Sequence, residues 1–342
     1  MFFSVLIILI TLGYTVFVGY NDGANAIATS IATRAMPRKT AVIVTVVFTI
    51  VAPLGYYLLG MDFSVASTIG KTVNHSDLAA KQDVIACAFL FTGVLGGLLW
   101  CLFSAKKRLP VSTSHSLMGG ISGAATAAFG FLPVDWRSLF IKIILTSVAV
   151  PLASFVVGFF IMKLAKRLAY KIPVSSDGII KKLQVLNVGI LASAISINNV
   201  QKPLGVAFLL FVIFGRADRL TDAPTIIAIT ALSALALVAG ACFGGTRIIH
   251  TVGKRIYKIK PFHSFLTQIS VESVIFAASS VGIPVSAGQA VSSAVMGIGA
   301  SSRFGGVNWS NSSRIFIFWI LTYPITFAIG ALFFYITRIF VG

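Results

Sequence analysis

The chain has 342 residues, of which 57% are hydrophobic and only 11% are charged. Soluble globular domains carry about a quarter charged residues, so this composition excludes an ordinary soluble domain and predicts a protein whose solvent is the lipid bilayer. The formal net charge of +18 does not indicate nucleic-acid binding, because the basic residues gather in connections between apolar stretches. Such loops face the cytoplasm and anionic lipid headgroups.

A membrane-spanning helix needs about 20 mostly apolar residues, and stretches of this kind recur along the whole chain. They lie at residues 2–18, 41–60, 84–104, 138–162, 184–197, 223–244, 264–281 and 313–340. We therefore expect an all-α integral membrane protein with about eight spans. The most hydrophilic stretch, residues 163–183, is predicted to be a basic cytoplasmic linker between a first transmembrane repeat, 1–162, and a second, 184–342.

Two polar phrases occur twice, in the same order and at similar spacing. Asn21-Asp22-Gly23-Ala24-Asn25 follows the first apolar stretch, and Asn198-Asn199-Val200-Gln201-Lys202 follows the first one after the linker. Pro110-Val111-Ser112 has its counterpart in Pro284-Val285-Ser286. Duplicated polar or proline-interrupted helices are typical of secondary transporters whose site lies near the bilayer midplane. Whether the two repeats are inverted is not decided by charge, because basic loops occur in both halves.

Three charged residues stand in or beside apolar stretches. A carboxylate there costs at least about 2.5 to 3.5 kcal/mol on insertion scales, so Asp22 should face a cavity, a cation or a partner. The alternative is that Asp22 caps a half-helix at the membrane interface. Glu272 either binds a coupling cation or proton or forms a structural pair with a neighbouring helix. Lys202 is a natural counter-charge for an anion or for Asp22.

The segment Pro110-Val111-Ser112-Thr113-Ser114-His115-Ser116 combines four hydroxyls with an imidazole. It predicts a re-entrant hairpin whose hydroxyls and free backbone N–H groups bind a tetrahedral oxyanion, with Pro110 at a helix start. The alternative is a serine- and threonine-rich packing interface. His115 is equally compatible with a structural role and with proton transfer.

Other classes of membrane protein fit the sequence less well. A channel would also use polar re-entrant segments, but its filter normally repeats by oligomer symmetry, whereas this duplication is internal. An intramembrane enzyme using Ser112 or Ser114 with His115 is disfavoured, because residues so close on one helix do not point together as nucleophile and base.

The duplicated phrases carry a family resemblance. The run from Gly19 to Pro37 and the segment Pro110 to Ser116 with Gly119-Gly120 resemble the two signatures of the inorganic phosphate transporter (PiT) family. In the second half, Asn198 to Lys202 and Gly282-Ile283-Pro284-Val285-Ser286 resemble the repeated signatures of its bacterial members. The resemblance covers nearly the whole chain and implies inverted repeats with broken helices in a bacterial cytoplasmic membrane.

The resemblance also implies a site. Asn21, Asp22 and Asn25 correspond to part of the substrate and cation site, and Ser112, Thr113 and Ser114 to phosphate ligands. The second-half counterparts are Asn198, Asn199, Gln201 and Ser286. We add Lys202 to the expected substrate ligands, and Glu272 and Asn199 to the expected cation ligands.

This chain departs from the family pattern in its second half. Where the family has His-Gly-x-Asn-Asp, this chain has Ile195-Ser196-Ile197-Asn198-Asn199, so one negative charge is missing. Where the family has Pro-x-Ser-Thr-Thr-His, it has Pro284-Val285-Ser286-Ala287-Gly288-Gln289, which removes two hydroxyls and an imidazole. The choice between sodium and proton therefore does not carry over, and the altered site leaves sulfate or another oxyanion open as the substrate.

Together these patterns predict a secondary active transporter of inorganic phosphate, not an enzyme. Coupling to a proton or to sodium and alternating access between the two repeats are expected. Retention of Asp22 favours phosphate over sulfate, because at neutral pH phosphate carries a proton that a carboxylate can accept. Besides the coupling ion no cofactor or metal is expected; the expected partners are phosphate and the bilayer, without nucleic acid, and a homo-oligomer is left open.

Overall fold

The computed structural model describes residues 2–74, 83–107, 111–169, 177–244 and 251–341. These residues are almost entirely helical, and their only β-type pairing is an isolated bridge between Val73 and Val134. The helices of the first half are α1 Phe2–Val18, π-helical η1 Gly19–Gly23, α2 Ala24–Ala32, α3 Arg38–Leu58, α4 Ser64–Gly70, α6 Asp83–Lys107, α7 Thr113–Phe129, α8 Trp136–Ile144, π-helical η2 Leu145–Ala149 and α9 Val150–Ala169.

The second half contains α10 Asp177–Ile213, the 3₁₀ turn η4 Ala217–Leu220, α11 Ala223–Phe243, π-helical η5 Thr251–Ile256, α13 Pro261–Ser280, α14 Ala287–Ser302, the 3₁₀ turn η6 Phe304–Gly306 and α15 Trp309–Val341. The predicted linker 163–183 is helical where α9 and α10 reach into it, and its residues 170–176 lie outside the described residues. Pro110, the expected start of the hairpin helix, also lies outside them.

Seven helices within the described residues are long and apolar enough to cross a membrane. They cover Phe3–Ala32, Arg38–Leu58, Val84–Lys107, Trp136–Leu168, Lys182–Ile213, Ala223–Phe243 and Trp309–Phe340. The eighth predicted stretch, 264–281, does form helix α13, but it is not among these seven. Most of its polar side chains are buried inside the protein, and Gln268 and Glu272 are examples.

Large apolar side chains cover the outside of the bundle. Phe160 on α9, Leu235 on α11 and Ile317 on α15 are all more than half exposed. An outward apolar surface on several long helices suits lipid chains rather than water. The chain is therefore an integral membrane protein.

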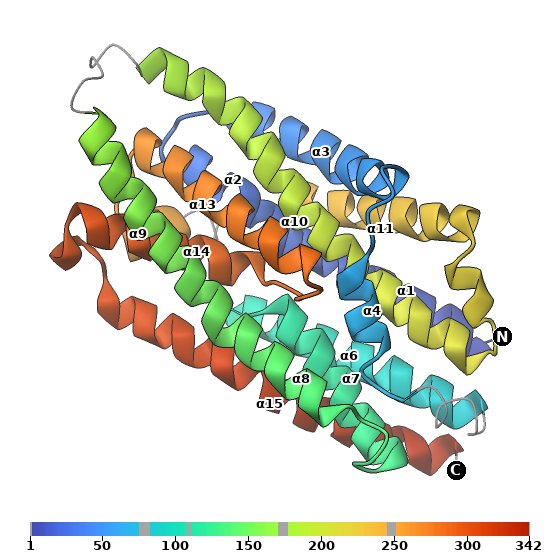
Figure 1. Ribbon diagram of the computed structural model, residues 1–342. Coiled ribbons are helices and arrows are strands. Elements are labelled where there is room, and N and C mark those ends of the chain that lie inside the picture. Colours follow the sequence, from blue (N-terminus) through green and yellow to red (C-terminus); the bar gives the residue numbers. More distant parts are fainter. Residues whose placement is uncertain (1, 75–82, 108–110, 170–176, 245–250, 342) are drawn as a thin grey trace.

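The two halves run in opposite directions. In Figure 1, α1 and α2 run from the N-terminus toward the end of the bundle where α10 begins, and α10 runs back the other way. The last helices of the halves, α8–α9 and α15, are likewise antiparallel. Since α1–α2 and α10 carry the first duplicated phrase, the repeats are inverted, as the resemblance implies.

One helix of each half packs against the other half. Helix α7 packs on α15 of the second half, and α14 packs on α9 of the first. Glycines bring the backbones together at both contacts: an added Cβ at Gly123 would lie 2.0 Å from the Phe327 carbonyl oxygen, and one at Gly297 would lie 2.1 Å from the Phe155 carbonyl oxygen. Small residues at such crossings allow the close approach that holds membrane helices together.

The close contact at Gly123 makes a testable prediction. Gly123→Ala forces α7 away from α15, so we expect the free energy of unfolding to fall by about 1–3 kcal/mol, the usual cost of overpacking. Gly55→Ala is the matched control, because nothing lies within 4 Å of its added methyl group and it is inside helix α3. Thermal unfolding in detergent should show a lower midpoint for Gly123→Ala alone; equal midpoints for the two variants would contradict the packing argument.

Candidate functional site

The N-terminal helix changes its winding at its polar phrase. Between α1 and α2, the π-helical segment η1 contains Asn21 and Asp22, and the backbone stays helical at Val18 and Ala24 on either side. The expected break in the helix is thus a π turn, a feature frequent at functional sites because it redirects side chains. The second-half counterpart in α10 is continuous, even though Pro203 follows the phrase directly.

Asp22 forms an ion pair with Lys202, and both side chains have no exposed surface. The Lys202 Nζ lies 3.8 Å from Asp22 Oδ2 and donates hydrogen bonds to Asn199 Oδ1 at 2.7 Å and to Thr113 Oγ1 at 3.0 Å. Asp22 Oδ2 also accepts from Asn199 Nδ2 at 3.0 Å and from the Thr113 hydroxyl at 3.4 Å. A buried pair is tolerated only when further hydrogen bonds satisfy both charges, as they do here.

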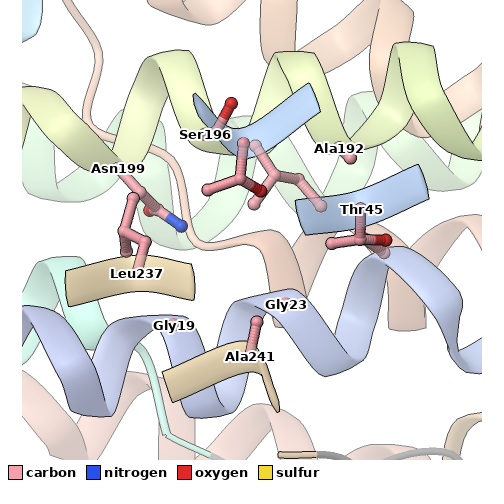
Figure 2. Close-up of a pocket in the computed structure, with 11 residues that line it drawn as sticks. Gly19, Gly23, Thr45, Ala192, Ser196, Asn199, Leu237 and Ala241 are labelled. Atoms are coloured by element: carbon pink, nitrogen blue, oxygen red, sulfur yellow. The ribbon is translucent and has the colours of Figure 1, made fainter. Parts of the chain in front are cut away.

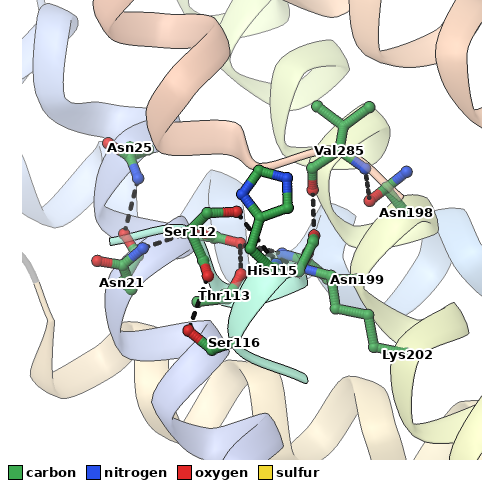
Figure 3. A network of polar contacts seen from close by, with 12 residues as sticks. Asn21, Asn25, Ser112, Thr113, His115, Ser116, Asn198, Asn199, Lys202 and Val285 are labelled. Carbon is green, nitrogen blue, oxygen red and sulfur yellow. Dashed lines mark hydrogen bonds and ion pairs between the residues drawn. The ribbon is translucent and has the colours of Figure 1, made fainter. Parts of the chain in front are cut away.

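The pair joins the two duplicated phrases. Asp22 comes from the first copy, and its partner Asn199 comes from the second. Lys202 comes from the second copy and Thr113 from the start of α7; Figure 3 labels Asn199, Lys202 and Thr113. We call these four residues the central cluster. The sequence offered an anion or Asp22 as the counter-charge of Lys202, and in this structure it is Asp22.

The two asparagines of the first phrase adjoin the central cluster. Asn21 Nδ2 donates to Asp22 Oδ1 at 2.9 Å, and Asn25 Nδ2 donates to the Asn21 carbonyl at 3.1 Å. The start of α14 also lies against Asn25, because a Cβ at Gly288 would lie 3.2 Å from Asn25 Nδ2. The absence of a side chain at Gly288 therefore lets α14 approach this phrase.

Helices α7 and α14 both begin close to the central cluster. Ser112 is the N-cap of α7 and accepts from the His115 N–H, whereas Ser114 Oγ donates to the Val285 carbonyl at 2.9 Å. The N–H of the same Val285 donates to Asn198 Oδ1 at 3.2 Å. The segment before α14 is thus held between one residue of each half.

Two predicted ligands do not contact the central cluster. Gln201 Oε1 accepts from the N–H groups of Val65 and Ala66 at 2.8 and 3.4 Å, so this side chain caps the short helix α4. Glu272 is buried on α13, and its Oε2 has no hydrogen-bond partner among the described residues. No contact between Glu272 and the central cluster is found within the described part of the chain.

Gln289 is a candidate site residue that the sequence patterns do not assign to the site. Gln289, at the start of α14, is fully buried, and neither its Oε1 nor its Nε2 has a partner in the described structure; the predicted ligand Ser286 likewise has an unpaired buried Oγ. In the first half, the Nε2 atom of the buried His115 imidazole lies 2.7 Å from Thr146 Oγ1. Gln289 could have been singled out by its alignment with His115 in the duplicated segment.

A second polar network lies between α2, α10 and α13. Gln268 Nε2 donates to Ser30 Oγ at 2.7 Å, Gln184 Nε2 donates to the same hydroxyl at 2.9 Å, and Asn187 Nδ2 donates to Gln268 Oε1 at 3.1 Å. These amides lie in or beside the apolar stretches of the sequence, which is the signal that could have marked them. They tie the first half to the second away from the central cluster.

The site is closed in this conformation. Asp22, Asn199, Lys202 and Thr113 are each at most 3% exposed. A cavity beside them, lined by glycines 19 and 23 and by Thr45, Asn199 and Leu237 among others (Figure 2), has room for about one water molecule. A solute larger than water can therefore reach the central cluster only after the helices move.

The sequence of this chain matches one protein family and several bacterial proteins. A family model described as the phosphate transporter family matches residues 18–176 and again 171–330. A protein of Bacillus subtilis (strain 168) named "Probable low-affinity inorganic phosphate transporter" is 31% identical over 335 residues, which is 97% of this chain and 96% of that protein. A protein of the same name from Mycobacterium leprae (strain TN) is 30% identical over 343 residues, covering all of this chain and 80% of that protein.

One solved structure shares the fold. It is titled "The sodium-dependent phosphate transporter" and aligns with a TM-score of 0.80 and 22% identity over 99% of this chain and 100% of that one. The double match of the family model agrees with the duplication seen in the sequence. With bacterial relatives and seven apolar helices, the chain is an integral protein of a bacterial cell membrane.

Proposed function

The chain belongs to the phosphate transporter family, and from this membership we propose that it carries inorganic phosphate across the membrane by alternating access, coupled to a cation. The observation that supports a site at the centre is that both copies of the duplicated phrase meet there. Related transporters built from inverted repeats place substrate and coupling ions at the repeat interface.

The starts of α7 and α14 are the proposed phosphate site. A helix N-terminus favours an anion, because its free N–H groups and its dipole both point at the ligand. The α14 start also has unfilled polar groups: the Ser286 hydroxyl and both polar atoms of the Gln289 amide are buried without partners among the described residues. Since unpaired buried polar groups are costly, a ligand that completes their hydrogen bonds gains that free energy.

Lys202 provides the positive charge in this proposal. In the closed conformation it is neutralised by Asp22, so an entering phosphate would compete with that carboxylate for the ammonium group. Ser112, Thr113 and Ser114 would add hydroxyl donors from α7. Phosphate binding would therefore open the Asp22–Lys202 ion pair. Through this link, binding can favour one conformation over another.

The closed site supports alternating access. The central cluster is buried, and the adjacent cavity holds about one water, so an open channel through this conformation is disfavoured. Inverted halves that exchange helices can rock against each other, which exposes one site to each side in turn. A homo-oligomer stays a prediction.

Phosphate uptake into proteoliposomes tests the proposal. We expect radiolabelled phosphate to accumulate when an inward cation gradient is imposed, and not in protein-free liposomes. Excess unlabelled sulfate should leave the initial rate unchanged. Competition by sulfate would favour a sulfate permease, and phosphate flux that never exceeds equilibration under any gradient would favour a channel.

A further inference from the structure

The Lys202 ammonium group occupies a cage of oxygen atoms. Asn199 Oδ1 lies 2.7 Å from Nζ, Thr113 Oγ1 lies 3.0 Å away, and Asp22 Oδ2 lies 3.8 Å away. A carboxylate, an amide carbonyl and a hydroxyl are the oxygen ligands that a hard cation prefers in proteins. The ammonium group is therefore already in the position where these three oxygens would hold a metal cation.

The charges of the central cluster balance without an added ion. Asp22 contributes one negative charge and Lys202 one positive charge, whereas Asn199 and Thr113 are neutral. The adjoining Asn21 and Asn25 are neutral as well. In the described part of the chain Asp22–Lys202 is the one ion pair between side chains, and Glu272 makes no contact with the cluster.

A sodium ion at Asp22 would meet two obstacles. It would share the cage with an ammonium group, and the repulsion between like charges is strong in a buried, low-dielectric site. It would also need the Asn199 and Thr113 oxygens, which already accept hydrogen bonds from Lys202. Both obstacles arise from one side chain.

We propose that Lys202 takes the place of a sodium ion at Asp22 and thereby sets the ion requirement of this transporter. Wild-type transport then proceeds without sodium. The inference rests on the proposed function, because it names the ion requirement of the same site. Lys202 then determines the ion specificity of the transporter, a role separate from the phosphate contact proposed above.

The wild-type protein supplies the first test. Phosphate uptake into proteoliposomes is measured under an inward proton gradient with sodium on both sides, and again with choline in place of sodium. We expect equal initial rates. A rate that collapses in choline overturns the inference while leaving the proposed function intact, whereas absence of phosphate uptake in every buffer overturns the proposed function itself.

Removal of the ammonium group supplies the second test. In Lys202→Ala the oxygen cage is vacant and the cluster has a net negative charge, so we expect sodium to stimulate uptake by about 5- to 150-fold, the usual range of coupling between two ligands. Lys142→Ala is the matched control, because Lys142 also donates to a threonine hydroxyl, Thr68 Oγ1 at 3.1 Å, but lies outside the cluster. Its uptake should not respond to sodium.

Binding of sodium can be followed without transport. Sodium should raise the thermal unfolding midpoint of Lys202→Ala in detergent more than choline does, and should raise that of wild type and Lys142→Ala no more than choline does. This readout remains available where Lys202→Ala no longer moves phosphate. Equal responses of Lys202→Ala and wild type to sodium, in uptake and in unfolding, overturn the inference.

Discussion

Asp22→Asn is expected to destabilise the protein by about 3–5 kcal/mol, because it leaves the buried Lys202 ammonium without its counter-charge. The substitution keeps the size of the side chain, so the effect comes from charge rather than from a cavity. We also expect phosphate uptake to fall to the level of protein-free liposomes, because phosphate binding is then no longer linked to opening of the Asp22–Lys202 ion pair, the change by which binding favours one conformation over another. Thermal unfolding in detergent and proteoliposome uptake measure the two effects.

Two further variants separate folding from transport. Asp62→Asn removes a carboxylate from an exposed position and should change the stability by less than about 0.5 kcal/mol. The double variant Asp22→Asn/Lys202→Gln removes both charges, which is often nearly neutral for stability, so it should regain most of the lost stability without regaining uptake. Asp22→Asn that unfolds and transports like wild type would show that the ion pair matters to neither property.

The positions of seven of the eight predicted spans and the meeting of the duplicated phrases could be predicted from the sequence. Apolar length is a local property, so α3, α6 and α11 lie where their apolar runs lie. The duplication indicated that two polar phrases share one site, and Asp22 does contact Asn199 from the second copy. Both predictions rest on residue types that can be recognised within short segments of the chain.

Other features depend on helix rotation and on distant contacts, which a sequence pattern does not contain. Gln201 shares a phrase with Lys202, yet its amide points to α4 and caps Val65. Glu272 is buried in the apolar stretch that forms α13, but among the described residues it makes no contact with the central cluster. The sequence predicts a break in the helix at this point, and the structure has a π turn at Gly19–Gly23. No residue type marks a change in helical winding, so the sequence pattern does not distinguish a π turn from a break.

Asn199→Asp tests whether charge alone decides the ion requirement. In wild type Asn199 Nδ2 donates to Asp22 Oδ2 at 3.0 Å, so the variant places two carboxylates against each other with only Lys202 to balance them. We expect a loss of about 3–5 kcal/mol in sodium-free buffer, as for other uncompensated buried charges. Because Lys202 still fills the oxygen cage, we expect sodium not to restore this stability. Restoration by about 2.7 kcal/mol, the effect of an ion present at about 100 times its dissociation constant, would mean that charge alone decides the ion requirement.

The thermal unfolding midpoint, measured in sodium and in choline, checks this expectation. Asn308→Asp is the matched control, because it makes the same change of charge at an exposed position and should respond equally to both salts. A sodium response in both Asn199→Asp and Lys202→Ala would mean that net charge governs ion binding, since both variants leave the cluster one charge negative. A response in Lys202→Ala alone would mean that the ion also needs the space the ammonium group fills, and that the paired carboxylates hold a proton instead.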